Sequence, residues 1–265
     1  MTVYAVALSK GGSTKTTTAA EVAAALAAAG RRVLAIDLDQ QGNLTTRMGV
    51  TRDTEVDAVA ADVLTGEATA TEAAVPAPSV PGAHIVAGTH DLADVESLPE
   101  VVSALRDHLP EVAGEWDDVV IDTPPALGSV TLTALAAADV VIAAVACETE
   151  AYDQLGRLVQ FVDKRVAPRL RPGQRVHWIV PTRYDARRLL DREVVELLHD
   201  RFPDRVTSPV CEAVAARDAY TDGKPVSVYV PESKIASDYA AALAPVIAGS
   251  VPTAARPAET TGARS

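Results

Sequence analysis

The chain has 265 residues, of which 48% are hydrophobic and 23% are charged, and its formal net charge is −12 at neutral pH. This length and composition suit one soluble α/β domain with a sizeable core. The negative net charge excludes a general polyanion binder, so any contact with nucleic acid must come from a local basic patch.

The two cysteines, Cys147 and Cys211, are far apart in the chain and form no CxxC pattern. This spacing argues against a disulfide framework, a zinc site and an iron–sulfur ligand set, and it fits a reducing cytoplasm. The first residues lead directly into a predicted strand, so we expect no signal peptide. No apolar run approaches the ~20 residues of a membrane-spanning helix, so we expect a cytoplasmic protein without a membrane partner.

Apolar and helical segments alternate along the chain. An alanine-rich helix is predicted over residues 16–29. Near-continuous apolar strands separated by helices predict an α/β fold with a mostly parallel sheet covered on both faces. Residues 68–81 predict a surface connection, and residues 250–265 have the composition of a disordered tail beyond a domain over 1–249. The predicted strands lie within residues 3–8, 33–36, 83–88, 117–125, 138–146, 175–182 and 205–210.

The segment KGGSTKTT, residues 10–17, lies between the first predicted strand and the first predicted helix. Gly11 and Gly12 permit backbone conformations and a close approach that a side chain would block. The helix that follows directs its free N–H groups and its positive dipole end at the loop, which favours a bound phosphate. This arrangement is typical of a phosphate-binding loop, and a plain Gly-Gly turn is the competing interpretation.

The lysines favour the phosphate-binding interpretation. Only five of the 24 cationic residues are lysines, and two of them, Lys10 and Lys15, fall in this loop. A lysine ammonium is the compact point charge that a phosphate cradle requires. We expect Lys15 to reach the β- and γ-phosphates of a nucleotide and the hydroxyl of Thr16 to ligate Mg²⁺.

The same segment resembles the deviant Walker A motif, KGGxxKT[TS], of the ParA/MinD ATPases, and the resemblance extends to about residue 247. It implies a single-domain P-loop NTPase fold and slow hydrolysis of ATP with Mg²⁺. It also implies that Lys10 crosses a dimer interface to the partner subunit's nucleotide, as an arginine finger does in other enzymes. Thr14 departs from the commoner glycine. The implied nucleotide-binding residues of the loop are Lys10, Gly11, Gly12, Ser13, Thr14, Lys15, Thr16 and Thr17.

Residues 35–45, AIDLDQQGNLT, resemble the second acidic motif of this family, DxDPQGN, with Gln40 in place of the usual proline. The resemblance implies that Asp39 positions or polarises the attacking water and that Asp37 supports the Mg²⁺ shell. Carboxylates at a strand's C-terminal end lie at the ligand edge of a parallel sheet. A solvated Asp pair that caps the strand is the competing interpretation. The implied catalytic residues are therefore Lys10, Lys15 and Asp39.

Residues 117–145 resemble the Walker B region of the same family. Asp122 ends an apolar strand and is expected to hold Mg²⁺ through water, because a hard cation prefers oxygen ligands. Asp117 and Asp118 precede the strand, and we expect both to be solvated. With Thr16 and Asp37, Asp122 completes the expected metal site.

The adenine site is indicated by position alone. In the fold that the resemblance implies, the base lies near the ends of the predicted strands 175–182 and 205–210. This indicates Thr182, Arg183, Pro209 and Val210 as adenine-binding residues, although Pro209 alternatively only turns the chain.

Residues 157–192 carry ten cationic and three acidic side chains, a local charge of +7 in a chain of net charge −12. Such segregation is the footprint of a phosphate-binding face, and a solvated helical surface is the competing interpretation. Arg187 stands where the resembling family carries a DNA-contacting arginine, and Arg183 and Arg188 lie near it. These three arginines are the predicted DNA-binding residues.

We therefore expect a ParA-type partition ATPase that forms a homodimer with ATP and binds double-stranded DNA non-specifically. A ParB-like partner would stimulate hydrolysis during plasmid or chromosome segregation, which implies a cytoplasmic, nucleoid-associated protein. One alternative is a MinD-like positioning ATPase with a membrane or protein cargo, although the Pro-, Ala- and Thr-rich tail shows no basic amphipathic segment. The other is a nucleotide-binding scaffold without hydrolysis, for which Thr14 and Gln40 are the only indications.

Overall fold

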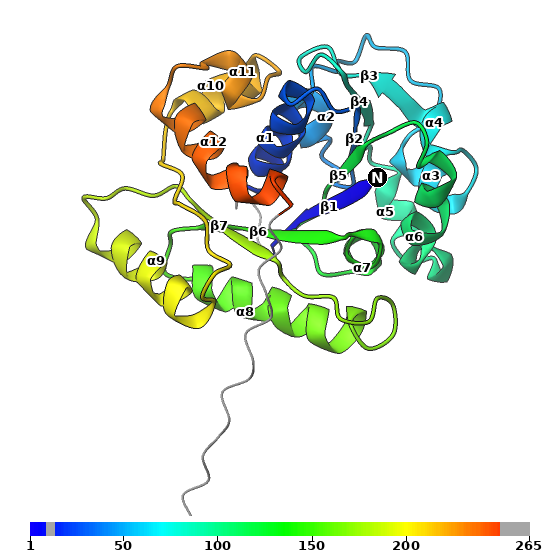
Figure 1. Cartoon of the computed structure of the whole chain (residues 1–265). Helices are drawn as coiled ribbons and strands as arrows, with labels where there is room; N and C mark the ends of the chain where they lie inside the picture. Colours follow the sequence, from blue (N-terminus) through cyan, green and yellow to red (C-terminus); the bar gives the residue numbers. More distant parts are fainter. Residues whose placement is uncertain (9–13, 250–265) are drawn as a thin grey trace, which may run out of the picture.

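The computed structural model describes residues 1–8 and 14–249, which build one seven-stranded sheet with helices on both faces (Figure 1). The strand order is β3-β4-β2-β5-β1-β6-β7, and neighbouring strands run parallel except β3 and β4. The predicted tail, residues 250–265, lies outside the described residues. The strands are β1 (Thr2–Ala7), β2 (Val33–Asp37), β3 (Ala74–Pro76), β4 (Ala83–Val86), β5 (Asp118–Asp122), β6 (Val140–Ala146) and β7 (Trp178–Thr182).

Helices connect the strands and cover the sheet, as the alternating pattern predicts. Short 3₁₀ turns lie at Pro99–Val102 and Leu109–Val112, and one π-helical turn at Val162–Val166 extends α8. The helices are α1 (Lys15–Ala28), α2 (Asn43–Arg47), α3 (Ala60–Thr65), α4 (Ala70–Ala73), α5 (Leu92–Val95), α6 (Ala104–His108), α7 (Ser129–Ala137), α8 (Ala151–Phe161), α9 (Leu189–Arg201), α10 (Ala215–Thr221), α11 (Val226–Tyr229) and α12 (Lys234–Ile247).

The sheet divides the hydrophobic core into two clusters. Along β1, Val3 and Ala5 pack into one cluster and Tyr4 and Val6 into the other, because successive side chains of a strand point to opposite faces. Helices α1, α2, α10, α11 and α12 cover the second face, and α3 to α9 cover the first. Figure 1 shows α1 and α12 on one side of the sheet and α7, α8 and α9 on the other. Both faces are buried, which explains why the strands are apolar throughout.

The structure confirms the predicted fold class and differs from the prediction in two segments. Residues 68–81 are not only a connection, because they contain α4 and the edge strand β3, which pairs antiparallel with β4. A three-residue strand that ends in proline is too short to give a period-two pattern, and proline is tolerated at a sheet edge. The pattern therefore gave no indication of β3.

Residues 205–210, predicted as a strand, run beside β7 without forming one. The amide of Ile179 donates to the carbonyl of Arg205 at 2.8 Å, and the amide of Val210 donates to the carbonyl of Pro181 at 2.8 Å. Pro181 and Pro209 have no amide hydrogen, so a continuous ladder between the two segments cannot form. The pairing is reduced to isolated bridges.

The start of β5 is tied to the connection between α1 and β2 by two ion pairs. Arg31 pairs with Asp118, and Arg32 pairs with Asp117 at 2.8 Å. The expectation that Asp118 is solvated is wrong, because its side chain is fully buried as the first residue of β5. Burial raises the pKa of the Asp118 carboxyl, and the Arg31 guanidinium opposes that rise.

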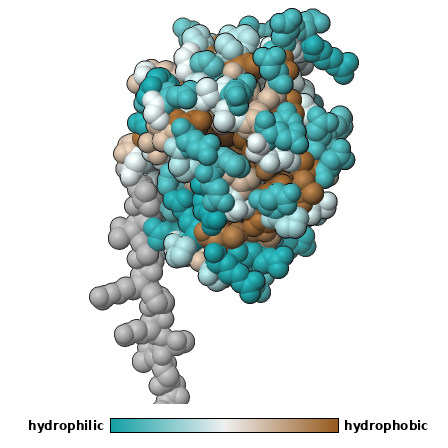
Figure 2. Space-filling model, turned by 90° about the vertical axis from the view of Figure 1, so that its right-hand side faces the viewer, coloured by the Kyte–Doolittle hydropathy of each residue, from teal (hydrophilic) through white to brown (hydrophobic). Residues whose placement is uncertain are grey.

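The surface view in Figure 2 shows mostly hydrophilic residues, with hydrophobic residues visible in patches between them. The described residues contain no helix whose length and hydrophobicity would let it span a bilayer.

One buried carboxylate joins α1 to α11. Glu21 is 2% exposed, and it accepts hydrogen bonds from the amides of Val226 at 2.5 Å and Ser227 at 3.3 Å. Burial raises the pKa of Glu21, while these hydrogen bonds favour its ionised form. These hydrogen bonds hold α11 against α1.

We predict that Glu21→Ala lowers the free energy of unfolding by about 1–3 kcal/mol, because a buried backbone amide loses its acceptor. Glu21→Gln should lie closer to the wild type, because its amide oxygen can still accept. Urea denaturation measures both, and the exposed Glu193→Ala is the control. An unchanged midpoint for Glu21→Ala would contradict this prediction.

Candidate functional site

A cavity of about 1520 Å³ opens at the carboxyl ends of the parallel strands. The N-terminal turn of α1 lines it, as do residues that follow β2 and β5 and residues at the end of β7. Helix α10 and the segment before it lie along another side. Ligands of open α/β sheets bind at this edge, so the cavity is the candidate functional site.

The predicted phosphate loop reaches this cavity, and only its last part is described. Lys10, Gly11, Gly12 and Ser13 lie outside the described residues. Thr14 has a φ of +64°, in the left-handed region. A residue with a side chain is strained there by roughly 1–2 kcal/mol. This backbone conformation explains why glycine is the commoner residue at the position.

The Thr14 side chain has a contact that glycine could not make. Its hydroxyl lies 2.6 Å from the hydroxyl of Thr182, the last residue of β7. This hydrogen bond offsets part of the strain and ties the end of the loop to the far half of the sheet. Thr182 was predicted as an adenine contact, and the structure places it beside the loop.

Lys15, Thr16 and Thr17 form the first turn of α1, and all three line the cavity. Lys15 is only 5% exposed. Burial lowers the pKa of its ammonium group, and the nearby carboxylates of Asp122 and Asp39 oppose that change. A buried ammonium at the positive end of a helix is a strong local attraction for an anion.

Asp37 is the last residue of β2 and is fully buried. Its carboxylate accepts from the Asp39 amide at 3.1 Å and from the amide and hydroxyl of Thr45, both at 2.8 Å. Burial raises the pKa of Asp37 to about 6, against the effect of these hydrogen bonds. The Thr45 hydroxyl also accepts from the Gly88 amide at 3.0 Å, so its direction is fixed. The sequence analysis did not identify Thr45 as a site residue.

Asp122 stands directly opposite Asp37, because the register pairs these two residues at the ends of β5 and β2. It is fully buried, and neither of its carboxylate oxygens accepts a hydrogen bond from a described residue. Burial and the Asp37 charge raise the pKa of Asp122, whereas Thr16 and Lys15 oppose that rise. Such a carboxylate is costly to bury without a cation, so these residues fit a bound metal ion.

Asp39 is the third carboxylate of the group and lines the cavity. It is 9% exposed, and it accepts from the Gln41 amide at 3.0 Å. The solvated pair considered for Asp37 and Asp39 is excluded by their burial. The structure therefore brings Lys15, Thr16, Asp37, Asp39 and Asp122 together around one end of α1.

Three of the four predicted adenine residues line the cavity, namely Thr182, Arg183 and Val210. Pro209 is not among the lining residues. Arg183 has a φ of +56°, and its guanidinium pairs with Glu148 at 2.6 Å. The adenine-binding roles of Thr182, Arg183, Pro209 and Val210 stay predictions.

Contacts between α2 and α10 hold α10 beside the cavity, and the sequence analysis did not predict these contacts. Arg47 is 7% exposed and donates to the carbonyl of Ala216 at 3.1 Å. Its guanidinium also lies 5.1 Å from the ring centre of Tyr220, whose hydroxyl donates to Asn43 at 2.8 Å. About 170 residues separate the two helices, so no local pattern could have revealed these contacts.

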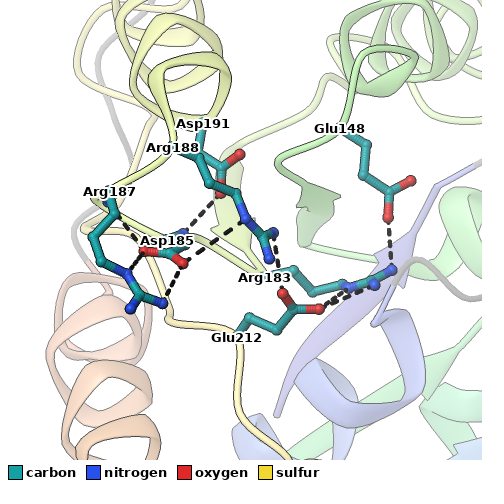
Figure 3. Close-up of polar contacts among 7 residues, drawn as sticks. All are labelled: Glu148, Arg183, Asp185, Arg187, Arg188, Asp191 and Glu212. Carbon is teal, nitrogen blue, oxygen red and sulfur yellow. Dashed lines mark hydrogen bonds and ion pairs between the residues drawn. The ribbon is translucent and has the colours of Figure 1, made fainter.

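The three predicted DNA-binding arginines lie among carboxylates (Figure 3), and of the three only Arg183 lines the cavity. Arg187 pairs with Asp185 at 2.8 Å, and Arg188 pairs with Glu212 at 3.1 Å. Within residues 157–192 only three acids oppose the cations, but Glu148 and Glu212 come from outside that segment. The local charge around these arginines is therefore lower than the segment alone indicates.

Helix α1 follows β1 and a loop, carries the buried Lys15, and faces carboxylates at the ends of β2 and β5. This combination defines a P-loop NTPase. A model of the AAA domain family matches residues 1–172. The chain is 38% identical over 234 residues to the chromosome partitioning protein ParA of Caulobacter vibrioides, covering 86% of each chain. The chain belongs to the ParA family of P-loop ATPases.

Two further proteins are similar to this chain. The chromosome-partitioning ATPase Soj of Thermus thermophilus is 37% identical over 238 residues, which cover 89% of this chain and 91% of that protein. Cobyrinic acid a,c-diamide synthase from Mycobacterium smegmatis, solved with bound ADP and magnesium, has a TM-score of 0.72 at 34% identity. That likeness covers 84% of this chain and 92% of the other.

The raised pKa of Asp37 predicts a pH dependence of stability. The folded protein holds this proton up to about pH 6, whereas the unfolded chain releases it near 3.8. The contribution of the Asp37 carboxyl to the free energy of unfolding is therefore fully present below pH 3.8 and is lost as the pH rises through about 6. Without nucleotide or magnesium, the free energy of unfolding should fall across this window.

Urea denaturation between pH 4 and 7 measures this slope. Asp37→Asn should flatten it, because the titrating carboxylate is gone, whereas the exposed Asp53→Asn should leave it unchanged. Since Asp37→Asn also loses an acceptor, only the slopes are compared. A slope in Asp37→Asn equal to that of the wild type would contradict the prediction.

Proposed function

We propose that the chain is a partition ATPase whose ATP-bound homodimer binds DNA without sequence preference and is released when a partner stimulates hydrolysis. The observation that carries this proposal is the fully buried carboxylate of Asp122 beside Lys15 and Thr16 at the start of α1. A cation and a polyphosphate would satisfy both the carboxylate and the ammonium. The relatives named ParA and Soj support the partition role.

Lys15 and the N–H groups of α1 would hold the phosphates of ATP, together with the loop residues before them. Thr16 and Asp122 would hold Mg²⁺, with Asp37 behind them. The described residues contain no group of three or more His, Cys, Asp or Glu that could hold a metal, so phosphate and water would supply the other ligands. Bound Mg²⁺ would neutralise charge on the phosphates.

Asp39 would orient the attacking water. Its carboxylate lies at the cavity wall, and its contact with the Gln41 amide restrains its direction. Gln40 lines the same cavity, in the place of the usual proline. Slow hydrolysis without the partner would keep the ATP state long-lived, as a switch requires.

Lys10 would act across the dimer interface, as the motif implies. A lysine from one subunit adds positive charge beside the partner subunit's phosphates only in the dimer. This arrangement makes turnover conditional on dimerisation.

We predict that Lys10→Ala binds ATP as a monomer but loses ATP-dependent dimerisation and hydrolysis, because its target is on the other subunit. Asp39→Ala should still dimerise but retain unhydrolysed ATP. Light scattering after size exclusion, phosphate release and titration with a fluorescent ATP analogue separate these outcomes. Lys15→Ala is the control that binds no nucleotide. Normal dimerisation and turnover in Lys10→Ala would refute the role across the interface.

DNA binding is assigned to Arg183, Arg187 and Arg188. Arg187 is 89% exposed, which suits a contact with a large partner. Phosphate contacts carry no base sequence, so they suit a protein that moves over the nucleoid. A DNA-bound, ParB-like protein is the proposed partner, and a plasmid or a chromosome is the cargo.

We predict that Arg187→Glu weakens the binding of all duplexes with ATP alike, because it removes phosphate contacts and adds repulsion. Each lost contact should reduce the slope of log affinity against log salt by about 0.9. Fluorescence anisotropy with unrelated duplexes at several salt concentrations measures both quantities. Arg52→Glu, the same charge change outside the basic segment, is the matched control.

Equal affinity and slope in wild type and Arg187→Glu would remove these arginines from the DNA-binding face. A wild type that ignores DNA but sediments with liposomes would instead favour a MinD-like positioning ATPase. Absence of phosphate release even with a partner would favour a nucleotide-binding scaffold.

A further inference from the structure

The arginine cluster, defined as Arg183, Arg187 and Arg188, is already occupied by carboxylates of the same chain (Figure 3). Four acids lie beside these three cations and offset much of their charge. A DNA phosphate that approaches Arg183 or Arg188 therefore competes with a carboxylate that already holds the guanidinium. The four acids are Glu148, Asp185, Asp191 and Glu212.

Asp185 pairs with Arg187 at 2.8 Å and, at the longer distance of 3.8 Å, with Arg188. Glu212 holds two arginines, one on each of its oxygens. One oxygen accepts from Arg183 at 3.1 and 3.3 Å, and the other pairs with Arg188 at 3.1 Å. Glu212 also lines the nucleotide cavity, in the segment that precedes α10. It is thus placed between the proposed nucleotide site and the proposed DNA face.

Asp185 has a different part in the cluster. It accepts from the amide and guanidinium of Arg187, and its own amide donates to Asp191 at 2.8 Å. These bonds shape the turn that carries the arginines, so Asp185 cannot be removed without changing the turn. The Glu212 side chain reaches the cluster from a separate segment, so it can be replaced without changing the turn, and it is the acid from outside the turn that pairs with Arg188.

We propose that Glu212 sets the DNA affinity of this protein by occupying Arg188 and Arg183 in competition with the phosphate backbone. This inference rests on the proposed DNA-binding function. The side chains of Glu212 and Arg188 are 37% and 55% exposed, so water screens the pair and a phosphate can displace the carboxylate. Glu212 lowers the affinity without abolishing it.

The expected size follows from the exposure of the pair. An exposed ion pair weakens a competing contact by about two- to five-fold. The proposed dimer presents two copies, so Glu212→Gln should tighten DNA binding by about four- to twenty-five-fold. The slope of log affinity against log salt should become steeper by about 0.9 for each additional phosphate that is neutralised.

The test compares Glu212→Gln with Glu193→Gln, an isosteric change of the same charge on the exposed part of α9. Anisotropy is measured on one duplex at several salt concentrations, with ATP above the Kd that each variant shows for it. Thermal melts verify that both variants are folded. Glu193→Gln reports the effect of the protein's total charge, and the excess in Glu212→Gln reports the specific pair.

A double-mutant cycle locates the effect. Most of the gain from Glu212→Gln should vanish in an Arg188→Ala background, because the released arginine is then absent. A gain for Glu212→Gln that matches Glu193→Gln, or that persists unchanged without Arg188, overturns the proposal.

The outcomes also separate this inference from the proposed function. If wild type binds DNA and Glu212→Gln gains no more than Glu193→Gln, only the role of Glu212 fails. If the wild type binds DNA too weakly for the titration to measure while Glu212→Gln binds it measurably and Glu193→Gln does not, the inference is supported. If neither binds DNA with ATP, the proposed DNA-binding function fails and the inference fails with it.

Discussion

Two buried carboxylates that face each other are the constraint on which the rest of the site depends. The parallel register places Asp37 opposite Asp122 at the ends of β2 and β5, where neither is exposed to water. Burial raises the pKa of Asp122, and repulsion from the like charge of Asp37 raises it further. Lys15 and the dipole of α1 supply positive charge on one side, and a bound cation would complete the balance. The site is therefore built for a ligand that carries both phosphate and metal.

Asp37 and Asp122 are held differently, and this difference fits the separate roles proposed for them. Asp37 has three hydrogen bonds from within the chain, so its position is fixed before any ligand arrives. Asp122 has none among the described residues, so its oxygens remain available. In the proposed function Asp37 would support the site while Asp122 would receive the cation, which is the usual relation between the outer and inner shells of a metal site.

The cavity also links segments that are remote in the chain. Thr14 meets Thr182 across the sheet, Arg47 on α2 holds α10, and Glu212 lies between the cavity and the arginine cluster. These contacts connect the end of the loop, α10 and the arginine cluster to the walls of one cavity.

The sequence by itself determined the fold class and the position of the nucleotide site. Apolar strands alternating with helices admit few arrangements, and carboxyl ends of parallel strands always meet at one edge. The loop motif could therefore be assigned with its carboxylates Asp37, Asp39 and Asp122. The pattern missed β3 and misplaced a strand at 205–210, because a short edge strand and proline-interrupted pairing leave no periodic signal.

Only the tertiary structure decided which side chains meet across long separations. The burial of Asp118, the contact of Arg47 with α10 and the hold of Glu212 on Arg188 arise from packing between distant segments. Local sequence carries no record of such contacts, because the partners are brought together by the sheet and not by their spacing.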